Sequence, residues 1–249
     1  VIMNPTFSMY SVCTVRAGGV PIYVDLQPDF SLDLEGVLEA CPDASLVFLC
    51  SPNNPTGNQF DTDDILRIVG ETPGMVLLDE AYVEFADSSL VSLPLKYDNV
   101  VVLRTMSKAF GLASLRVGYC IASEDVAFQL RERLQLPYPV SSVAVATAQR
   151  MLKWRKVVLE ACSRLSQTRA RFLSLLAEVQ GVSAFDSQAN FVLMDCNTPS
   201  ASVVSRMRER GYLLRDIGTA CGYRNLVRVT VPPPESLDSV VAALREVVD

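Results

Sequence analysis

The chain has 249 residues, of which 49% are hydrophobic, and this is enough for a substantial buried core in one large domain or two small ones. Its formal net charge is -6 and its basic residues form no long cluster, which argues against nucleic acid and anionic membranes as partners. The sequence contains no histidine, so Ser-His-Asp and Cys-His catalysis are excluded. Lysine, tyrosine or a carboxylate must carry any acid–base chemistry.

The cysteines and the start of the sequence bear on where the protein works. Seven cysteines are scattered without a Cys-x-x-Cys pair, which indicates reduced thiols in the cytoplasm and argues against disulfides or a structural metal site. The apolar runs are strand-sized, far short of the roughly 20 residues that a membrane helix needs. Residues 1–5 resemble neither a signal peptide nor an initiator segment, so we expect the sequence to begin inside a longer protein.

From residue 45 to residue 122, short apolar runs alternate with turns and helical stretches. Continuous Val, Leu, Ile and Phe without polar alternation is typical of strands that are buried on both faces of a sheet. Between the first two runs, Asp61 and the acidic residues after it predict the N-cap and first turn of a helix. We therefore predict an α/β fold with a mostly parallel sheet, its strands at 45–50, 75–78, 100–103 and 117–122.

Beyond residue 141 the apolar residues recur with helical spacing as far as Leu176, and the tail then returns to mixed elements. We interpret residues 1–140 as a large domain, and residues 141–249 as linking helices followed by a smaller α+β domain. In the tail, we predict strands at 190–194, 212–214 and 226–231 and helices at 200–210 and 235–248.

Polar side chains follow three of the predicted strands. The segments are Ser-Pro-Asn-Asn-Pro-Thr-Gly at 51–57, Asp-Glu-Ala-Tyr at 79–82 and Thr-Met-Ser-Lys at 105–108. Ligands of open α/β sheets bind at the carboxyl ends of strands, so we expect the three loops to converge on one site. Together they supply an amide, a carboxylate, a phenol, hydroxyls and an amine.

These three segments, with Arg116 eight residues after Lys108, resemble the cofactor motifs of fold-type I aminotransferases. Within that superfamily the sequence is most similar to the histidinol-phosphate aminotransferase family. The similarity keeps the family's order along the whole chain, because residues 4–10, 104–112, 214–216 and 227–231 also match. It implies the fold-type I transferase fold and pyridoxal 5′-phosphate as the cofactor. It also implies an amino donor and a 2-oxo acid as small-molecule substrates, and a homodimer in the cytoplasm.

The resemblance assigns roles to the central residues of the motifs. Lys108 would bind the aldehyde of the cofactor and then move the proton at the substrate α-carbon, the base role that histidine cannot fill here. Asp79, after an apolar run, would pair with the protonated pyridine nitrogen, since a buried carboxylate needs a cationic partner to stay ionised. The neighbouring Glu80 is interpreted as structural. Asn54 and Tyr82 would hydrogen-bond the ring hydroxyl.

The remaining cofactor contacts concern the ring face and the phosphate. Phe7 would stack on the ring, although packing in the core is an alternative for an aromatic side chain. Arg116, Ser107 and Thr105 would bind the phosphate, for which a guanidinium fork and hydroxyl donors are suited. Family members carry roughly a hundred further residues before this point, including a Gly-rich helix start that also contacts the phosphate.

Two arginines bear on the choice of substrate. Arg228, on an apolar predicted strand, resembles the arginine that binds the substrate carboxylate, and its surroundings predict an anionic partner. Arg215 resembles the arginine that contacts the substrate phosphate, with a solvent-facing charge on an edge strand as the alternative. The expected reaction is transamination between histidinol phosphate and 2-oxoglutarate. Threonine-phosphate decarboxylation, aromatic transamination and a non-catalytic homologue remain as alternatives.

Overall fold

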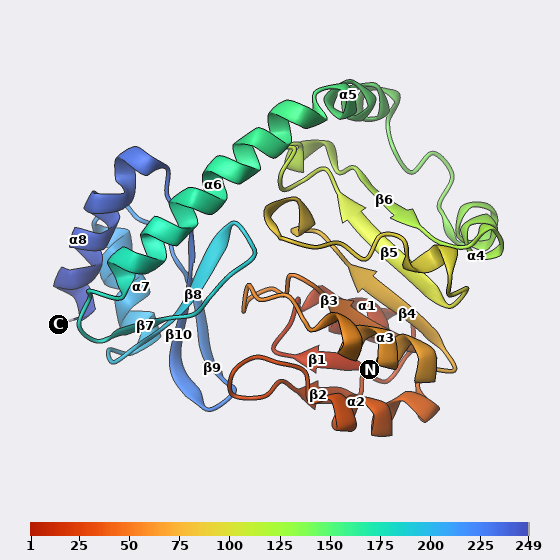
Figure 1. Ribbon diagram of the computed structural model, residues 1–249, viewed down its shortest axis with the longest axis horizontal. Coiled ribbons are helices and arrows are strands. Elements are labelled where there is room, and N and C mark those ends of the chain that lie inside the picture. The colour runs from red at the N-terminus through yellow and green to blue at the C-terminus, as the bar shows by residue number, and fades with distance from the viewer. Residues whose placement is uncertain (249) are drawn as a thin grey trace.

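A six-stranded sheet forms the N-terminal half of the protein. The computed structural model describes residues 1–248 and orders these strands β2-β1-β3-β4-β5-β6 (Figure 1). All neighbouring pairs are parallel except β5 with β6, which confirms the predicted mostly parallel sheet. The strands are β1 (Ile2–Asn4), β2 (Tyr23–Asp25), β3 (Leu46–Cys50), β4 (Met75–Asp79), β5 (Val100–Thr105) and β6 (Gly118–Ile121).

Helices α1 (Met9–Arg16), α2 (Leu34–Ala40), α3 (Thr62–Glu71) and α4 (Glu124–Gln129) accompany this sheet. The predicted cap of α3 is confirmed, because the Asp61 carboxylate accepts hydrogen bonds from the backbone nitrogens of Asp63 and Asp64. The apolar stripe of α3 packs into the core together with the central strands. This packing holds β3, β4 and β5 side by side, so that their carboxyl ends meet at one edge.

Two helices connect the two halves of the protein. The predicted helical segment is present as α5 (Ser142–Lys153) and the long α6 (Arg155–Leu176), with a break at Trp154. Helix α6 runs from the large sheet to the second sheet (Figure 1). None of the helices within residues 1–248 combines the length and the apolar character that crossing a bilayer requires.

The C-terminal half is built on a four-stranded antiparallel sheet in the order β7-β8-β10-β9. Its elements are β7 (Val182–Ala184), β8 (Phe191–Cys196), α7 (Ser200–Glu209), β9 (Arg215–Ala220), β10 (Tyr223–Thr230) and α8 (Leu237–Val248). The helix predicted from residue 235 starts as a short 3-10 turn, Pro234–Ser236, before α8.

The strand predicted at 212–214 is wrong, since the strand begins only at Arg215. The amide of Tyr212 donates to the carbonyl of Met207 at 3.0 Å, and Gly211 before it has a φ of 86°. These features close the C-terminus of α7 in the manner of a Schellman motif. The Tyr212 amide is therefore bonded to the helix end and does not pair with a strand. Tyr212 and Leu214 pack on the core of the C-terminal half without strand pairing.

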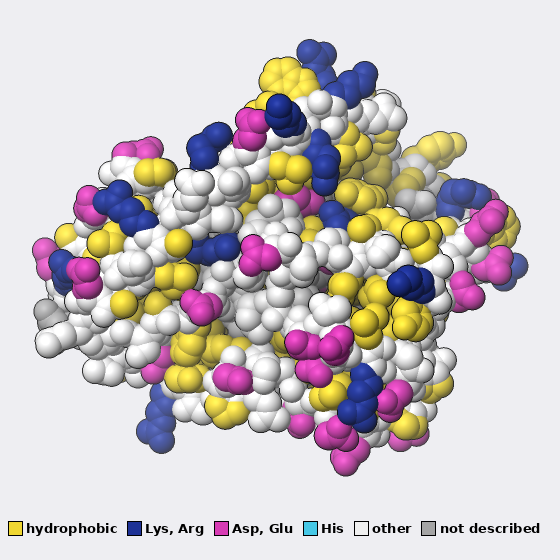
Figure 2. Space-filling view, in the orientation of Figure 1, with side chains coloured by type: hydrophobic (Ala, Val, Ile, Leu, Met, Phe, Trp, Pro, Cys, Tyr) yellow, Lys and Arg dark blue, Asp and Glu magenta, His cyan; other side chains and the backbone are white. Residues whose placement is uncertain are grey.

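An aromatic cluster joins the two halves of the protein. Phe30 lies 4.8 Å from Phe185 and 5.6 Å from Tyr223 between ring centroids, and the latter two rings lie 4.9 Å apart. Nearby, Gly57 has a φ of 85°, and an added Cβ would lie 2.5 Å from the Ser187 hydroxyl, so this close approach requires glycine. On the face of the molecule that Figure 2 shows, side chains of both charge signs are interspersed.

Candidate active site

The three polar loops meet at the carboxyl edge of the large sheet, as predicted. A cavity of about 460 Å³ opens there between the two halves of the protein. A second cavity, of about 590 Å³, adjoins it, since Phe7, Asp79 and Lys108 line both. The first cavity also contains Asn54, Tyr82, Arg215 and Arg228, and the second also contains Thr105, Ser107 and Arg116. All ten residues predicted for the site therefore lie around one continuous space.

Asp79, the last residue of β4, is held from two directions. The Tyr10 hydroxyl donates to Oδ2 at 2.7 Å, and the Ala81 amide donates to Oδ1 at 2.9 Å. Burial raises the pKa of the Asp79 carboxyl, while these hydrogen bonds and the charge of Lys108 act in the opposite direction. A cation bound in the cavity would favour the ionised form, as expected for a carboxylate that pairs with a protonated ring nitrogen.

Tyr10 is a site residue to which the sequence pattern assigned no role. It lies in the first turn of α1, and its ring stacks on Phe48 at 4.9 Å between centroids, with only 6% of the residue exposed. Burial raises the pKa of its phenol far above the usual value, so the hydroxyl stays protonated and remains a donor to Asp79. The sequence feature that points to Tyr10 is its place three residues after Phe7, within the segment 4–10 that matches the family.

Lys108 lies in the loop after β5 with its Nζ 5.1 Å from the centroid of the Tyr82 ring. Burial lowers the pKa of the Lys108 amine, and the nearby charge of Arg228 lowers it further, whereas Asp79 raises it. A lowered pKa favours the neutral amine, which is the form that attacks an aldehyde or accepts a proton. Burial raises the pKa of Tyr82 to about 12, so its phenol remains a hydrogen-bond donor.

Arg228 on β10 reaches across from the four-stranded sheet to the N-terminal half of the protein. One guanidinium nitrogen donates to the side-chain oxygen of Asn54, and the guanidinium lies 4.8 Å from the centroid of the Phe191 ring. The predicted anionic partner is wrong for the protein alone, because no carboxylate within residues 1–248 forms an ion pair with Arg228. The Asn54 side-chain oxygen and the Phe191 ring stabilise the Arg228 guanidinium, and Arg228 also lines the first cavity.

Arg215 is paired in register with Arg228 on the neighbouring strand. It lies on the edge strand β9 and is exposed, as the edge-strand alternative predicts, but it also lines the first cavity. The charge of Arg215 is one of the causes that lower the pKa of Arg228, after burial. Two cations beside each other in one wall indicate a site for anionic groups.

The second cavity contains the residues predicted to bind phosphate. The Thr105 hydroxyl accepts a hydrogen bond from the Ser107 amide at 3.0 Å, which orders the turn that leads to Lys108. Arg116 has a φ of 54°, and its Nη1 donates to the Ala113 carbonyl at 2.9 Å. This contact orients the guanidinium toward a cavity that also contains two hydroxyl groups.

Phe7 lines both cavities and is not part of the core. Its residue is 41% exposed, and its ring meets that of Tyr10 edge to face at 5.6 Å. The alternative of simple core packing is therefore wrong. An exposed aromatic face beside a cavity is suited to stacking against a planar ligand.

The donor set fits pyridoxal 5′-phosphate group by group. The cavities offer an amine for the aldehyde, a supported carboxylate for the ring nitrogen and neutral donors for the ring hydroxyl. A guanidinium and hydroxyls are available for the phosphate. Within residues 1–248 no group of acidic, cysteine or histidine side chains is arranged to hold a metal ion. The fold and the site thus define a pyridoxal-phosphate-dependent aminotransferase.

Comparison with known proteins agrees with this class. The family described as aminotransferase class I and II matches residues 1–244, and the chain belongs to this family. A histidinol-phosphate aminotransferase of Thermoanaerobacter sp. is 36% identical over 245 residues, which are 98% of this chain and 69% of that protein. Histidinol-phosphate aminotransferase 2 of Archaeoglobus fulgidus is 37% identical over 251 residues, which are 99% of this chain and 70% of that protein.

Solved structures show the same fold. The histidinol-phosphate aminotransferase of Sinorhizobium meliloti, in complex with pyridoxal-5′-phosphate, has a TM-score of 0.89 and 28% identity, with coverage of 100% of this chain and 70% of that chain. The histidinol-phosphate aminotransferase of Clostridium acetobutylicum has a TM-score of 0.91 and 23% identity, with coverage of 99% and 76%.

Proposed function

We propose that this aminotransferase moves the amino group of L-histidinol phosphate to 2-oxoglutarate, a step of histidine biosynthesis. The observation that carries the proposal is the pair of arginines, Arg215 and Arg228, beside each other in the wall of the cavity that contains Lys108. Histidinol phosphate has a phosphate and no carboxylate, whereas 2-oxoglutarate has carboxylates and no phosphate. A site that accepts both in turn needs more than one cation. The named relatives support the same substrate.

The roles of the individual residues are part of the proposal. In the first cavity, Asp79, Asn54 and Tyr82 would hold the ring of the cofactor, and Phe7 would stack on it. In the second cavity, Arg116, Ser107 and Thr105 would hold its phosphate. When bound, the cofactor delocalises the electron pair that remains when the α-proton of the substrate leaves. Lys108, whose amine pKa is lowered by burial, would accept that proton and move it between the substrate α-carbon and the cofactor.

We also propose a homodimer in the cytoplasm. Large apolar side chains are exposed along α5 and just beyond it, with Val143 69% exposed and Trp154 56% exposed, and such a surface is suited to a second copy of the chain. The seven cysteines are free thiols in the structure, which suits a reducing compartment. Light scattering on the purified full-length protein would measure the mass, and a monomer at micromolar concentration would contradict the dimer.

The first experiment identifies the lysine that binds the cofactor. The full-length protein is reduced with borohydride in the presence of pyridoxal 5′-phosphate and then mapped by peptide mass. We expect the adduct on Lys108. An adduct on another lysine would contradict the assignment, and no adduct at all would favour the non-catalytic alternative.

The second experiment tests the substrate through Arg215→Ala. This change removes a charge-assisted contact to the substrate phosphate, which contributes roughly 1.5–3 kcal/mol. We expect kcat/KM with histidinol phosphate to fall by about ten- to a hundredfold, since each 1.4 kcal/mol is a factor of ten. Phenylalanine, which lacks phosphate, should lose much less. Equal losses on both substrates would make Arg215 structural, and a wild-type preference for phenylalanine or for decarboxylation of threonine phosphate would replace the proposed reaction.

A further inference from the structure

A largely buried ion-pair cluster borders the candidate active site. Glu80 follows Asp79 at the end of β4, and Arg104 precedes Thr105 at the end of β5. The Glu80 amide donates to the Leu103 carbonyl at 2.9 Å, so the two strand ends remain paired at this point. Side chains of neighbouring residues in an extended chain point to opposite sides, and accordingly Asp79 lines both cavities whereas Glu80 lines neither. Arg104, the partner of Glu80, lines the second cavity together with Thr105.

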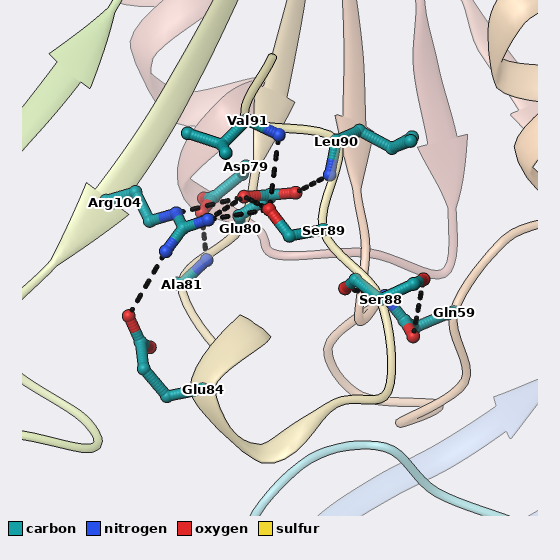
Figure 3. Close-up of polar contacts among 10 residues, drawn as sticks. All are labelled: Gln59, Asp79, Glu80, Ala81, Glu84, Ser88, Ser89, Leu90, Val91 and Arg104. Carbon is teal, nitrogen blue, oxygen red and sulfur yellow. Dashed lines mark hydrogen bonds and ion pairs between the residues drawn. The ribbon is translucent and has the colours of Figure 1, made fainter. Parts of the chain in front are cut away.

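The contacts of Glu80 use both of its carboxylate oxygens. Oε2 lies 2.9 Å from Nε and 2.7 Å from Nη2 of Arg104, and it also accepts from the Ser89 hydroxyl at 3.1 Å. Oε1 accepts from the Leu90 amide at 2.6 Å. Figure 3 shows the Arg104 guanidinium between the Glu80 carboxylate and Glu84. The Glu84 Oε1 lies 3.5 Å from Nη1 of Arg104. The Glu80 side chain is only 2% exposed, so it depends on these partners.

The cluster connects the two loops that carry the chemistry. Tyr82 lies in the loop between Glu80 and Ser89, and that loop contains only one short 3-10 turn, Val83–Phe85. Arg104 lies on the strand that leads to Lys108. Through Glu80, Ser89 and Leu90, Arg104 therefore ties the loop of Tyr82 to the strand of Lys108.

We propose that Glu80 and Arg104 are positioning residues, which set the placement of Asp79 and Tyr82 relative to Lys108. The inference rests on the cofactor and reaction given above. A misplacement of about 1 Å at a reacting group can lower a rate roughly a hundredfold. Loss of the cluster should therefore lower turnover more than substrate binding, because the substrate arginines belong to the other sheet.

The test uses Glu80→Gln, Arg104→Lys and the double variant in the full-length protein loaded with pyridoxal 5′-phosphate. We expect kcat to fall by about tenfold or more, with KM for histidinol phosphate changed by less than about threefold. The double variant should lose no more than the worse single variant, since the two residues act as a unit. The visible-region circular dichroism of the bound cofactor, which reports the asymmetry of its surroundings, should change in all three variants.

The matched control is Val241→Ala in the buried face of α8, which lowers stability in the C-terminal half, away from these loops. At an equal loss of thermal stability, it should leave the circular dichroism and kcat as in the wild type. Wild-type dichroism and kcat in Glu80→Gln, or an equal loss of kcat in Val241→Ala, would overturn the positioning role and leave the proposed function intact. A wild-type protein that shows no cofactor signal would overturn both.

Discussion

The hydrogen bond from the Tyr10 hydroxyl to Asp79 shows how a single residue behind the site supports its chemistry. The proposed reaction needs Asp79 as an anion, yet burial raises the pKa of its carboxyl. The hydroxyl of Tyr10 donates to the ionised form and so lowers that pKa again. Because the phenol of Tyr10 itself stays protonated, this support persists across the working pH range.

Replacement of Tyr10 by phenylalanine keeps the stacking on Phe48 and removes only the hydroxyl. The pKa of Asp79 should then rise, so the carboxylate becomes protonated over a wider acid range. We expect the acid limb of the pH profile of kcat/KM to move to higher pH, and kcat/KM at neutral pH to fall by about tenfold. Tyr223→Phe in the aromatic cluster is the control. An unchanged acid limb in Tyr10→Phe would contradict the role of this hydroxyl.

At the scale of elements, the site depends on parallel strands whose ends meet and on a helix that holds them. Helix α3 lies between β3 and β4 in the sequence, and its buried face packs on the sheet core. Its start is ordered by the Asp61 carboxylate, which satisfies two backbone nitrogens. The cap therefore supports the packing on which the strand ends depend, although it touches no ligand.

Asp61→Ala should lower the free energy of unfolding by about 0.5–2 kcal/mol, the usual contribution of a helix N-cap. Asp61→Asn keeps an acceptor at the same position and should remain within a few tenths of a kcal/mol of the wild type. Urea unfolding followed by far-ultraviolet circular dichroism measures both. Equal losses in the two variants would mean that the charge of Asp61, rather than its capping bond, is what matters.

At the scale of the whole molecule, α6 couples the two halves. Its Arg169 is only 7% exposed and donates to the Phe85 carbonyl at 3.3 Å and the Ala189 carbonyl at 2.8 Å. Phe85 belongs to the loop of Tyr82, and Ala189 precedes β8 of the second sheet. Further along the same helix, Phe172 and Leu176 pack in the core of the C-terminal half. One helix thus bonds to both halves near the site.

Arg169→Met should lower the free energy of unfolding by about 1–3 kcal/mol, because the Ala189 carbonyl loses its donor and the Phe85 carbonyl keeps only the Ser166 hydroxyl at 3.4 Å. Arg171→Met is the matched control on the same helix, where the side chain is 58% exposed and pairs with Asp238 at 3.4 Å. That exposed pair should contribute less than about 1 kcal/mol. Urea unfolding compares the two, and similar losses would argue against a special role for Arg169.

Much of this architecture was determined by the sequence itself. Continuous apolar runs predicted β3, β4, β5 and β6, the Asp61 signal predicted the start of α3, and the ten residues predicted from the ordered motifs are all among those that line the two cavities. Such features are local: they depend on side-chain periodicity, capping and short segments that carry their own chemistry. The burial on both faces predicted for the strand at 117–122 is wrong, because β6 is a largely exposed antiparallel strand at the edge of the sheet.

The tertiary structure decided the features that depend on distant partners. The apolar residues 212–214 predicted a strand, but the backbone of Tyr212 closes the end of α7, and only the helix geometry shows this. Arg228 suggested an anionic partner, yet Asn54, 174 residues away, and the ring of Phe191 provide its contacts. Tyr10 meets Asp79 across 69 residues, and Glu80 meets Arg104 across 24. These contacts form only once the strands lie side by side. The spacing of two distant residues along the chain does not show whether their side chains are in contact after folding.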